Sequence, residues 1–297
     1  MESMPNFFVI GAARAGTTAL YNFLYQHPQV FMPEVKEPGF FMLEGTQREN
    51  PYSDLEYAVS NIDTYRSLFA GAQSQHLAVG EATTGYLTTA HVPERIKARV
   101  PEARLIVLLR NPIDRAYSEW ELLYRAGREQ LSFEEAVRQE PETPATNLPW
   151  NPDELKYVRK GLYHAHLTRY YELFDPAQIG VFLFDDWRSN QLDTLQRIYQ
   201  FLGVDDTFAP DTNIEHNVGG VPKNKFVYDL IFGSDSLKQV AKNLLPTKYL
   251  KQIRGAFLDR SKDGLTPQMR QQLIDHYRPD VQALEKLIDR DLSHWLK

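Results

Sequence analysis

The sequence predicts an α/β fold in which a central parallel sheet is flanked by helices. Three observations predict this class. Short apolar runs alternate along the chain with segments whose apolar residues have helical spacing. Several runs are apolar at every position, as expected for parallel strands covered on both faces. The turns after them carry glycine, asparagine or proline, residues that begin helices. Right-handed crossovers should then place helices on both faces of the sheet.

Each predicted element follows from this pattern. The predicted strands are residues 7–10, 76–80, 105–109 and 179–184. The predicted helices are residues 19–24, 92–96, 112–123, 163–174, 192–202, 226–232, 237–245 and 269–287. The last three give the chain a helical C-terminal part. No linker, repeat or low-complexity tract interrupts the sequence, so residues 1–297 are expected to form a single domain.

Composition excludes several functional classes. The net charge of −6 argues against a general nucleic-acid binder, which needs a large basic surface. The absence of cysteine from the sequence excludes disulfides, thiolate nucleophiles and cysteine zinc sites. The N-terminal segment lacks the basic residues and the long apolar stretch of a signal peptide. No apolar run approaches the roughly 20 residues that a transmembrane helix needs. A cytoplasmic protein without a transmembrane segment is expected.

The loop after the first strand has the spacing of a phosphate-binding loop. Gly11 and Gly16 are separated by four residues and followed by Thr17 and Thr18. Glycines let successive backbone N–H groups face one anion, and the following helix presents its N-terminal donors to the same anion. Thr17 stands where nucleotide-hydrolysing loops have lysine, so Arg14 must supply the cation. The alternative is a glycine-containing turn that binds nothing.

A second anion site is predicted after the third strand. Arg110 follows that strand directly, and Ser118 lies eight residues further, along the next helix. Open α/β sheets bind ligands at the carboxyl edge of their strands, so this segment and the loop of Arg14 could hold two phosphates of one nucleotide. The alternative is a structural salt bridge and a surface serine. Asp114 and Arg115 are expected to form a solvated pair or to support the helix start.

Two stretches carry a family resemblance. FFVIGAARAGTTALYNFLYQHPQVFMPEVKEPGFF and LIVLLRNPIDRAYSEW resemble the donor-binding motifs of sulfotransferases that use 3′-phosphoadenosine-5′-phosphosulfate (PAPS), particularly the bacterial and heparan-sulfate-type branches. LTPQMRQQLIDHYRPDVQALEKLIDRDLSHW resembles the helical ending of that family. The resemblance implies a P-loop NTPase-like three-layer sandwich. It also implies transfer of a sulfuryl group from PAPS to an acceptor hydroxyl or amine, with adenosine 3′,5′-bisphosphate (PAP) as product and no metal.

The resemblance assigns the donor-binding residues. The loop that would cradle the 5′-phosphosulfate comprises Arg14, Ala15, Gly16, Thr17, Thr18 and Ala19. Arg110 and Ser118 match the family's 3′-phosphate motif, and Lys223 lies in the best match to its third donor element. Arg14 replaces the usual lysine, which keeps the charge but changes the geometry.

The catalytic assignment follows from the chemistry and the resemblance together. Sulfuryl transfer needs a base for the acceptor proton and a cation for the leaving phosphate. Glu37 is the expected base because it matches the glutamate of the family's Lys-Glu-Pro-x-Phe-Phe stretch, with Lys36 assisting and Arg14 as the cation. Glu81 is the second candidate carboxylate. His164 and His166 are further candidates on the acceptor side, although helical histidines are usually structural.

Two other functional classes stay open: a P-loop kinase or nucleotide hydrolase, and a nucleotide-binding module without turnover. Two features argue against a kinase or hydrolase. The loop lacks the Gly-Lys-Ser/Thr sequence, and Arg110 stands where an acid that holds magnesium would be expected. The acceptor is expected to be a carbohydrate or glycolipid hydroxyl, or alternatively a small or carrier-protein-bound natural product. The aromatic residues that could stack on it are Phe40, Phe41, Tyr86, Trp120 and Tyr124.

Overall fold

A five-stranded parallel sheet forms the centre of the structure, a computed structural model that describes residues 4–45, 59–143, 155–211 and 265–297. The strands are β1 (Phe7–Gly11), β2 (Val30–Phe31), β3 (Ala78–Ala82), β4 (Arg104–Leu109) and β5 (Ile179–Leu183). Their order across the sheet is β2-β3-β1-β4-β5, and every neighbouring pair is parallel. The predicted parallel sheet is therefore confirmed.

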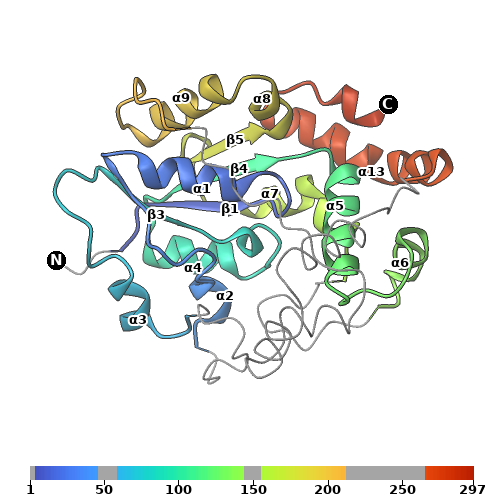
Figure 1. The fold of residues 1–297 in the computed structure, drawn as a ribbon, viewed down its shortest axis with the longest axis horizontal. Helices are drawn as coiled ribbons and strands as arrows, with labels where there is room; N and C mark the ends of the chain where they lie inside the picture. Colours follow the sequence, from blue (N-terminus) through green and yellow to red (C-terminus); the bar gives the residue numbers. More distant parts are fainter. Residues whose placement is uncertain (1–3, 46–58, 144–154, 212–264) are drawn as a thin grey trace, which may run out of the picture.

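Helices cover both faces of this sheet. In chain order they are α1 (Thr17–Gln26), α2 (Phe40–Leu43), α3 (Ile62–Ser67), α4 (Val92–Arg99), α5 (Pro112–Arg125), α6 (Phe133–Gln139), α7 (Tyr163–Tyr171), α8 (Phe184–Ser189), α9 (Gln191–Leu202) and α13 (Pro267–Ile288). Figure 1 shows α1 and α9 above the sheet and α4 below it. This is the three-layer arrangement that the sequence predicted. Of the helices in the described ranges, none has both the length and the apolarity needed to span a bilayer.

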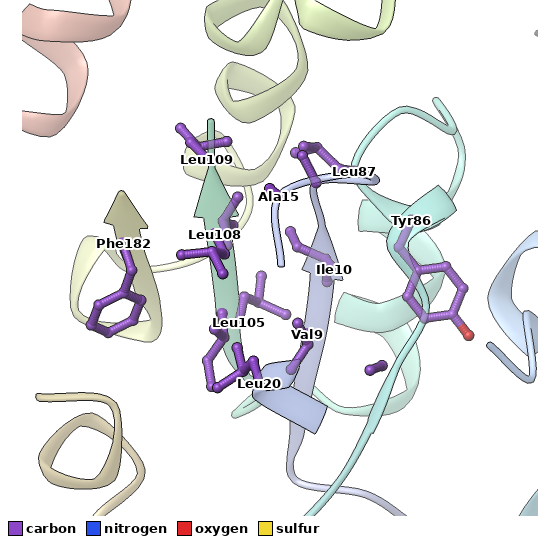
Figure 2. Packing of buried hydrophobic residues seen from close by; sticks show 14 of the residues in the cluster. Val9, Ile10, Ala15, Leu20, Tyr86, Leu87, Leu105, Leu108, Leu109 and Phe182 are labelled. Carbon is purple, nitrogen blue, oxygen red and sulfur yellow. The ribbon is translucent and has the colours of Figure 1, made fainter. Parts of the chain in front are cut away.

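The core lies on both sides of the two central strands. All residues of β1 are buried, and the five residues of β4 after Arg104 are completely inaccessible to solvent. Continuous apolar runs form such strands because neither face meets water. Figure 2 shows this packing around β1 and β4, with Ala15 and Leu87 at the end of β1 beside Leu109 at the end of β4.

The loops after β1, β3 and β4 converge at the carboxyl edge of the sheet. Beyond the end of β1, the N–H of Ala12 donates to Leu108 O in β4 at 2.9 Å. On the other side, the N–H groups of Thr83 and Leu87 donate to β1 carbonyls, at 3.1 Å and 2.8 Å. Because β1 lies between β3 and β4, all three loops open onto one site.

The element boundaries differ from the predictions in a few places. The second predicted strand is displaced and runs as β3 to Ala82, which places Glu81 inside it. Phe184 begins α8 and does not end β5; its ring packs against Gly16, so a tertiary contact accounts for its apolar character. The two-residue edge strand β2 is too short to produce a pattern. The helices predicted at 226–232 and 237–245 lie outside the described residues.

Candidate functional site

The loop after β1 ends at Gly16, a position that only glycine suits. Gly16 caps α1 with φ 91°, in the left-handed region, and a Cβ there would lie 3.1 Å from the Phe184 ring. The chain can therefore turn tightly from β1 into α1. The N–H groups of the first turn, from Thr17 to Ala19, have no acceptor within the helix and lie at its positive end. This end of α1 can accept an anion.

The two predicted anion-binding motifs contact each other. Arg14 Nε donates to Ser118 Oγ at 3.2 Å, and Arg110 Nη1 donates to Arg14 O at 3.1 Å. The Arg110 guanidinium also lies over the Phe184 ring, 5.1 Å from its centroid. Residues 96 positions apart in the chain thus form one cationic edge.

Burial lowers the pKa of both Arg14 and Arg110, and for Arg14 the neighbouring charge of Arg110 lowers it further. Arginine stays protonated under all ordinary conditions. An exposed guanidinium, that of Arg14, and a half-buried one, that of Arg110, therefore lie near each other, which favours binding of an anionic ligand. Lys223, the third predicted donor residue, lies outside the described residues.

Glu37 lies at the same edge, in a turn of residues 37–41 that follows β2 and runs into the first residues of α2. Its Oε2 accepts the backbone N–H of Thr84 at 2.7 Å, and the Thr84 hydroxyl donates to both carboxylate oxygens. Lys36 Nζ forms an ion pair with Glu37 Oε1. The Glu37 side chain is 39% exposed, so it is fixed in position yet open to a reactant.

A pocket of about 340 Å³ lies beside Glu37, and Arg14, Arg110 and Ser118 are not among its lining residues. Its lining includes Ala12 and Ala13 from the loop after β1, and Lys36 and Glu37 from the turn before α2. Glu37 therefore lines the same cavity as Ala12 and Ala13 of the predicted anion-binding loop. Such a cavity can hold a reactant between the loop and the carboxylate.

Three charged side chains at the pocket form a cluster that sequence reasoning missed. Arg115 donates to Glu119 Oε2 at 2.6 Å, and Lys160 donates to Glu119 Oε1 at 2.8 Å. All three are buried and line the pocket. Although burial opposes its ionisation, Lys160 and Arg115 lower the pKa of Glu119. The spacing of Arg115 and Glu119 on one helix could have indicated a pair.

The predicted pairing of Asp114 with Arg115 is wrong. Arg115 points inward, where it contacts Glu119 and the Tyr157 carbonyl, and only 1% of it is exposed. Asp114 instead accepts Arg270 from α13 at 2.7 Å. Residues adjacent on a helix point in directions about 100° apart, so one faces the core while the other faces α13.

Comparison with known proteins identifies the family. Residues 5–208 match the sequence model of the sulfotransferase family. The chain belongs to that family. A crystal structure of a sulfotransferase from Alicyclobacillus acidocaldarius is 30% identical and superimposes with a TM-score of 0.74, covering 99% of this chain and 100% of that one.

Two relatives have names that refer to sulfation of carbohydrates. The mouse bifunctional heparan sulfate N-deacetylase/N-sulfotransferase 4 is 26% identical over 308 residues, which cover this whole chain and 31% of the mouse protein. Human carbohydrate sulfotransferase 15 is 24% identical over 250 residues, covering 69% of this chain and 44% of the human protein. The chain thus spans about a third of the length of the first relative and less than half of the second.

The other polar candidates lie elsewhere in this sulfotransferase fold. Glu81 is fully buried below the pocket and does not line it. His166 is also buried, with its ring bonded to Arg159 O at 3.0 Å, and burial lowers its pKa to about 4. His164 lines a separate hollow beside α13. Within the described ranges, no three His, Asp or Glu side chains are grouped so that they could hold a metal ion.

The predicted stacking role of several aromatic residues is wrong. Phe40, Phe41 and Tyr86 are completely buried, and Trp120 is 5% exposed. They pack on one another and on neighbouring rings as part of the core. Of the five, Tyr124 has an exposed ring, and it stacks on Trp120. These buried aromatic residues therefore support the site from the core and do not form its surface.

Proposed function

We propose that the chain transfers a sulfuryl group from PAPS to an acceptor hydroxyl or amine. The observation that carries the proposal is the contact of Arg14 with both Ser118 and Arg110, beside a pocket that contains Glu37. One ligand with two anionic groups fits this arrangement better than two separate anions do. Membership of the sulfotransferase family supports the same activity.

The donor would be held at both of its anionic ends. The 11–18 loop and the first turn of α1 would bind the 5′-phosphosulfate through backbone N–H groups and Arg14. Arg110 and Ser118 would bind the 3′-phosphate, and Lys223, which lies outside the described residues, stays a predicted donor residue. Bidentate guanidinium contacts suit both groups. Because these anchors lie on three different elements, they would fix the direction in which the sulfuryl group faces the pocket.

Glu37 would act as the general base. In the transfer, the acceptor oxygen or nitrogen forms a bond to sulfur while the bond from sulfur to the bridging phosphate oxygen breaks. The acceptor proton goes to Glu37, and PAP leaves with the electron pair of the broken bond. Arg14, assisted by Lys36, would stabilise the negative charge that develops on the leaving oxygen. The Thr84 contacts would keep the carboxylate aimed at the acceptor.

We propose a carbohydrate or glycolipid acceptor. The names of the mouse and human relatives refer to heparan sulfate and to carbohydrate, which supports this class. Arg115, Glu119 and Lys160 line the pocket, whose surface is otherwise mostly apolar, and could bind hydroxyls of the acceptor. A small or carrier-bound natural product is the alternative acceptor.

We also propose that residues 1–297 form one domain. Helix α13 supports this, because Arg270 pairs with α5 and Tyr277 Oη donates to Val158 O at 2.8 Å. Asp280 further accepts the N–H groups of His164 and Ala165 at the start of α7. The C-terminal helix is thereby bonded to α5, which carries Ser118, to Val158 and to the start of α7.

The test is incubation with sulfur-labelled PAPS across a panel of carbohydrate, glycolipid, phenol and carrier-bound acceptors. Labelled product and released PAP should appear together in equal amounts. Glu37→Gln should keep its affinity for PAP in calorimetry and lose turnover, whereas Arg14→Ala and Arg110→Ala should each bind PAP at least tenfold more weakly, the loss of about 1.4 kcal/mol. Turnover of ATP with magnesium, or PAP binding without transfer to any acceptor, would contradict the proposal. Full activity of Glu37→Gln would remove Glu37 as the base.

A further inference from the structure

Glu81 is a fully buried carboxyl group that three hydroxyls surround. Tyr86 Oη donates to its Oε1 at 2.6 Å, Tyr65 Oη donates to the same oxygen at 3.1 Å, and Thr83 Oγ1 donates to Oε2 at 2.7 Å. Glu81 itself has no exposed surface and does not line the pocket. Burying a carboxyl group costs free energy unless hydrogen bonds compensate for the lost water. The groups that bond to Glu81 therefore indicate its role.

Two of these hydroxyls continue to the turn of residues 37–41. The Gly39 N–H donates to Thr83 Oγ1 at 3.2 Å, and the Phe41 N–H donates to Tyr86 Oη at 3.3 Å. Each hydroxyl has a single hydrogen. When Glu81 accepts that hydrogen, the oxygen lone pairs of the hydroxyl are directed at the backbone N–H. Glu81 thus bonds the turn at two points through two directed chains.

The turn needs such anchors because its backbone is in an unfavourable conformation. Glu37 has φ 60° and Gly39 has φ 70°, so two of its five residues are left-handed. For a side-chain-bearing residue such as Glu37 this conformation costs roughly 1–2 kcal/mol. One further backbone bond, from Glu37 N–H to Ala82 O at 2.9 Å, connects the turn to β3. These anchors hold the backbone of Glu37, while Thr84 and Lys36 contact its carboxylate.

We infer that Glu81 is a positioning residue that, through the hydroxyls of Thr83 and Tyr86, holds the 37–41 turn so that Glu37 faces the pocket. The inference rests on the proposed function, in which Glu37 takes the acceptor proton. Glu81 would then affect the reaction by positioning Glu37, without contacting either substrate. It also explains why the structure keeps three hydroxyls and a carboxyl group in the core behind a partly exposed glutamate.

Two tyrosines on the same carboxyl oxygen offer a matched test. Tyr86→Phe removes both the donor to Glu81 and the acceptor for Phe41 N–H, whereas Tyr65→Phe removes only a donor to Glu81. Both tyrosines are fully buried, and both variants keep the ring. Tyr86→Phe should lower kcat about tenfold to a hundredfold, since small misplacements of a reacting group have effects of that order. Its KM for PAPS should stay unchanged. Tyr65→Phe should keep kcat within about twofold.

Amide hydrogen exchange gives a readout that does not depend on activity. In Tyr86→Phe the Phe41 amide should exchange at least about tenfold faster than in the unchanged protein, while in Tyr65→Phe its rate should stay the same. Glu81→Gln should show faster exchange at both Gly39 and Phe41. Equal kcat and equal exchange in the two tyrosine variants would overturn the inference. If the unchanged protein transfers no sulfate at all, the proposed function fails, yet the exchange comparison still decides whether Glu81 holds the turn.

Discussion

Glu81 should make its own contribution to the pH dependence of stability. Burial raises the pKa of this carboxyl group to about 7, whereas in an unfolded chain it would titrate near 4.5. Between these values the folded protein binds a proton that the unfolded chain has released, so the contribution of Glu81 to stability falls as pH rises. Each pH unit across the window is equivalent to about 1.4 kcal/mol, which gives Glu81 a total effect of about 3 kcal/mol.

Glu81→Gln isolates this effect because glutamine has nearly the same shape and does not titrate. Urea unfolding of both proteins should be followed from pH 4.5 to 8. The free energy of unfolding of the unchanged protein, relative to the variant, should decline by about 3 kcal/mol up to pH 7 and then level off. A difference that stays constant with pH would show that Glu81 has an ordinary pKa in the folded protein and would refute the reasoning from burial.

Two other substitutions test buried groups by the same measurement. Glu119→Gln should destabilise the protein by about 3–5 kcal/mol, because Arg115 and Lys160 would lose their shared anionic partner in the core. Glu121→Gln is the control: it breaks the more exposed pair with Arg125 on the same helix and should cost less than about 1 kcal/mol. Equal losses in the two would contradict the burial of the cluster. Burial lowers the pKa of His166 to about 4, so at this residue the folded protein binds fewer protons than the unfolded chain. The contribution of His166 to stability should therefore be lost as pH falls from about 6.5 to 4, opposite in sign to that of Glu81. His166→Gln should abolish that acid-side loss, and an unchanged acid limb would mean that His166 ionises freely.

Local patterns in the sequence were sufficient to predict the framework of the site. The strand at 105–109 is apolar at every position, and Asn111 caps the helix after it by accepting the N–H groups of Ile113 and Asp114. The sheet order places the end of this strand next to the end of β1. Arg14 and Arg110 were therefore predicted at a common edge, and the structure brings them into contact. Such inferences work because they depend on neighbours in the chain and on the general rule for parallel sheets.

Burial of polar residues could not be predicted in the same way. The structure pairs Glu119 with Lys160, which lies 41 residues further along, and surrounds Glu81 with hydroxyls from three positions between residues 65 and 86. Nothing in the local sequence distinguishes Arg115 from a surface arginine, or Phe40 from a residue that stacks on a ligand. Burial follows from which distant segments pack together.

The sequence by itself determined the fold class, and it predicted an anion-binding loop and the cationic residue that follows the third predicted strand, because each of these is encoded by spacing within a few residues. Only the tertiary structure decided that Arg115, Glu119 and Lys160 form one buried cluster and that Glu81 lies behind the turn of Glu37. The cost of burying a charge depends on every partner within a few ångströms, and those partners come from distant parts of the chain.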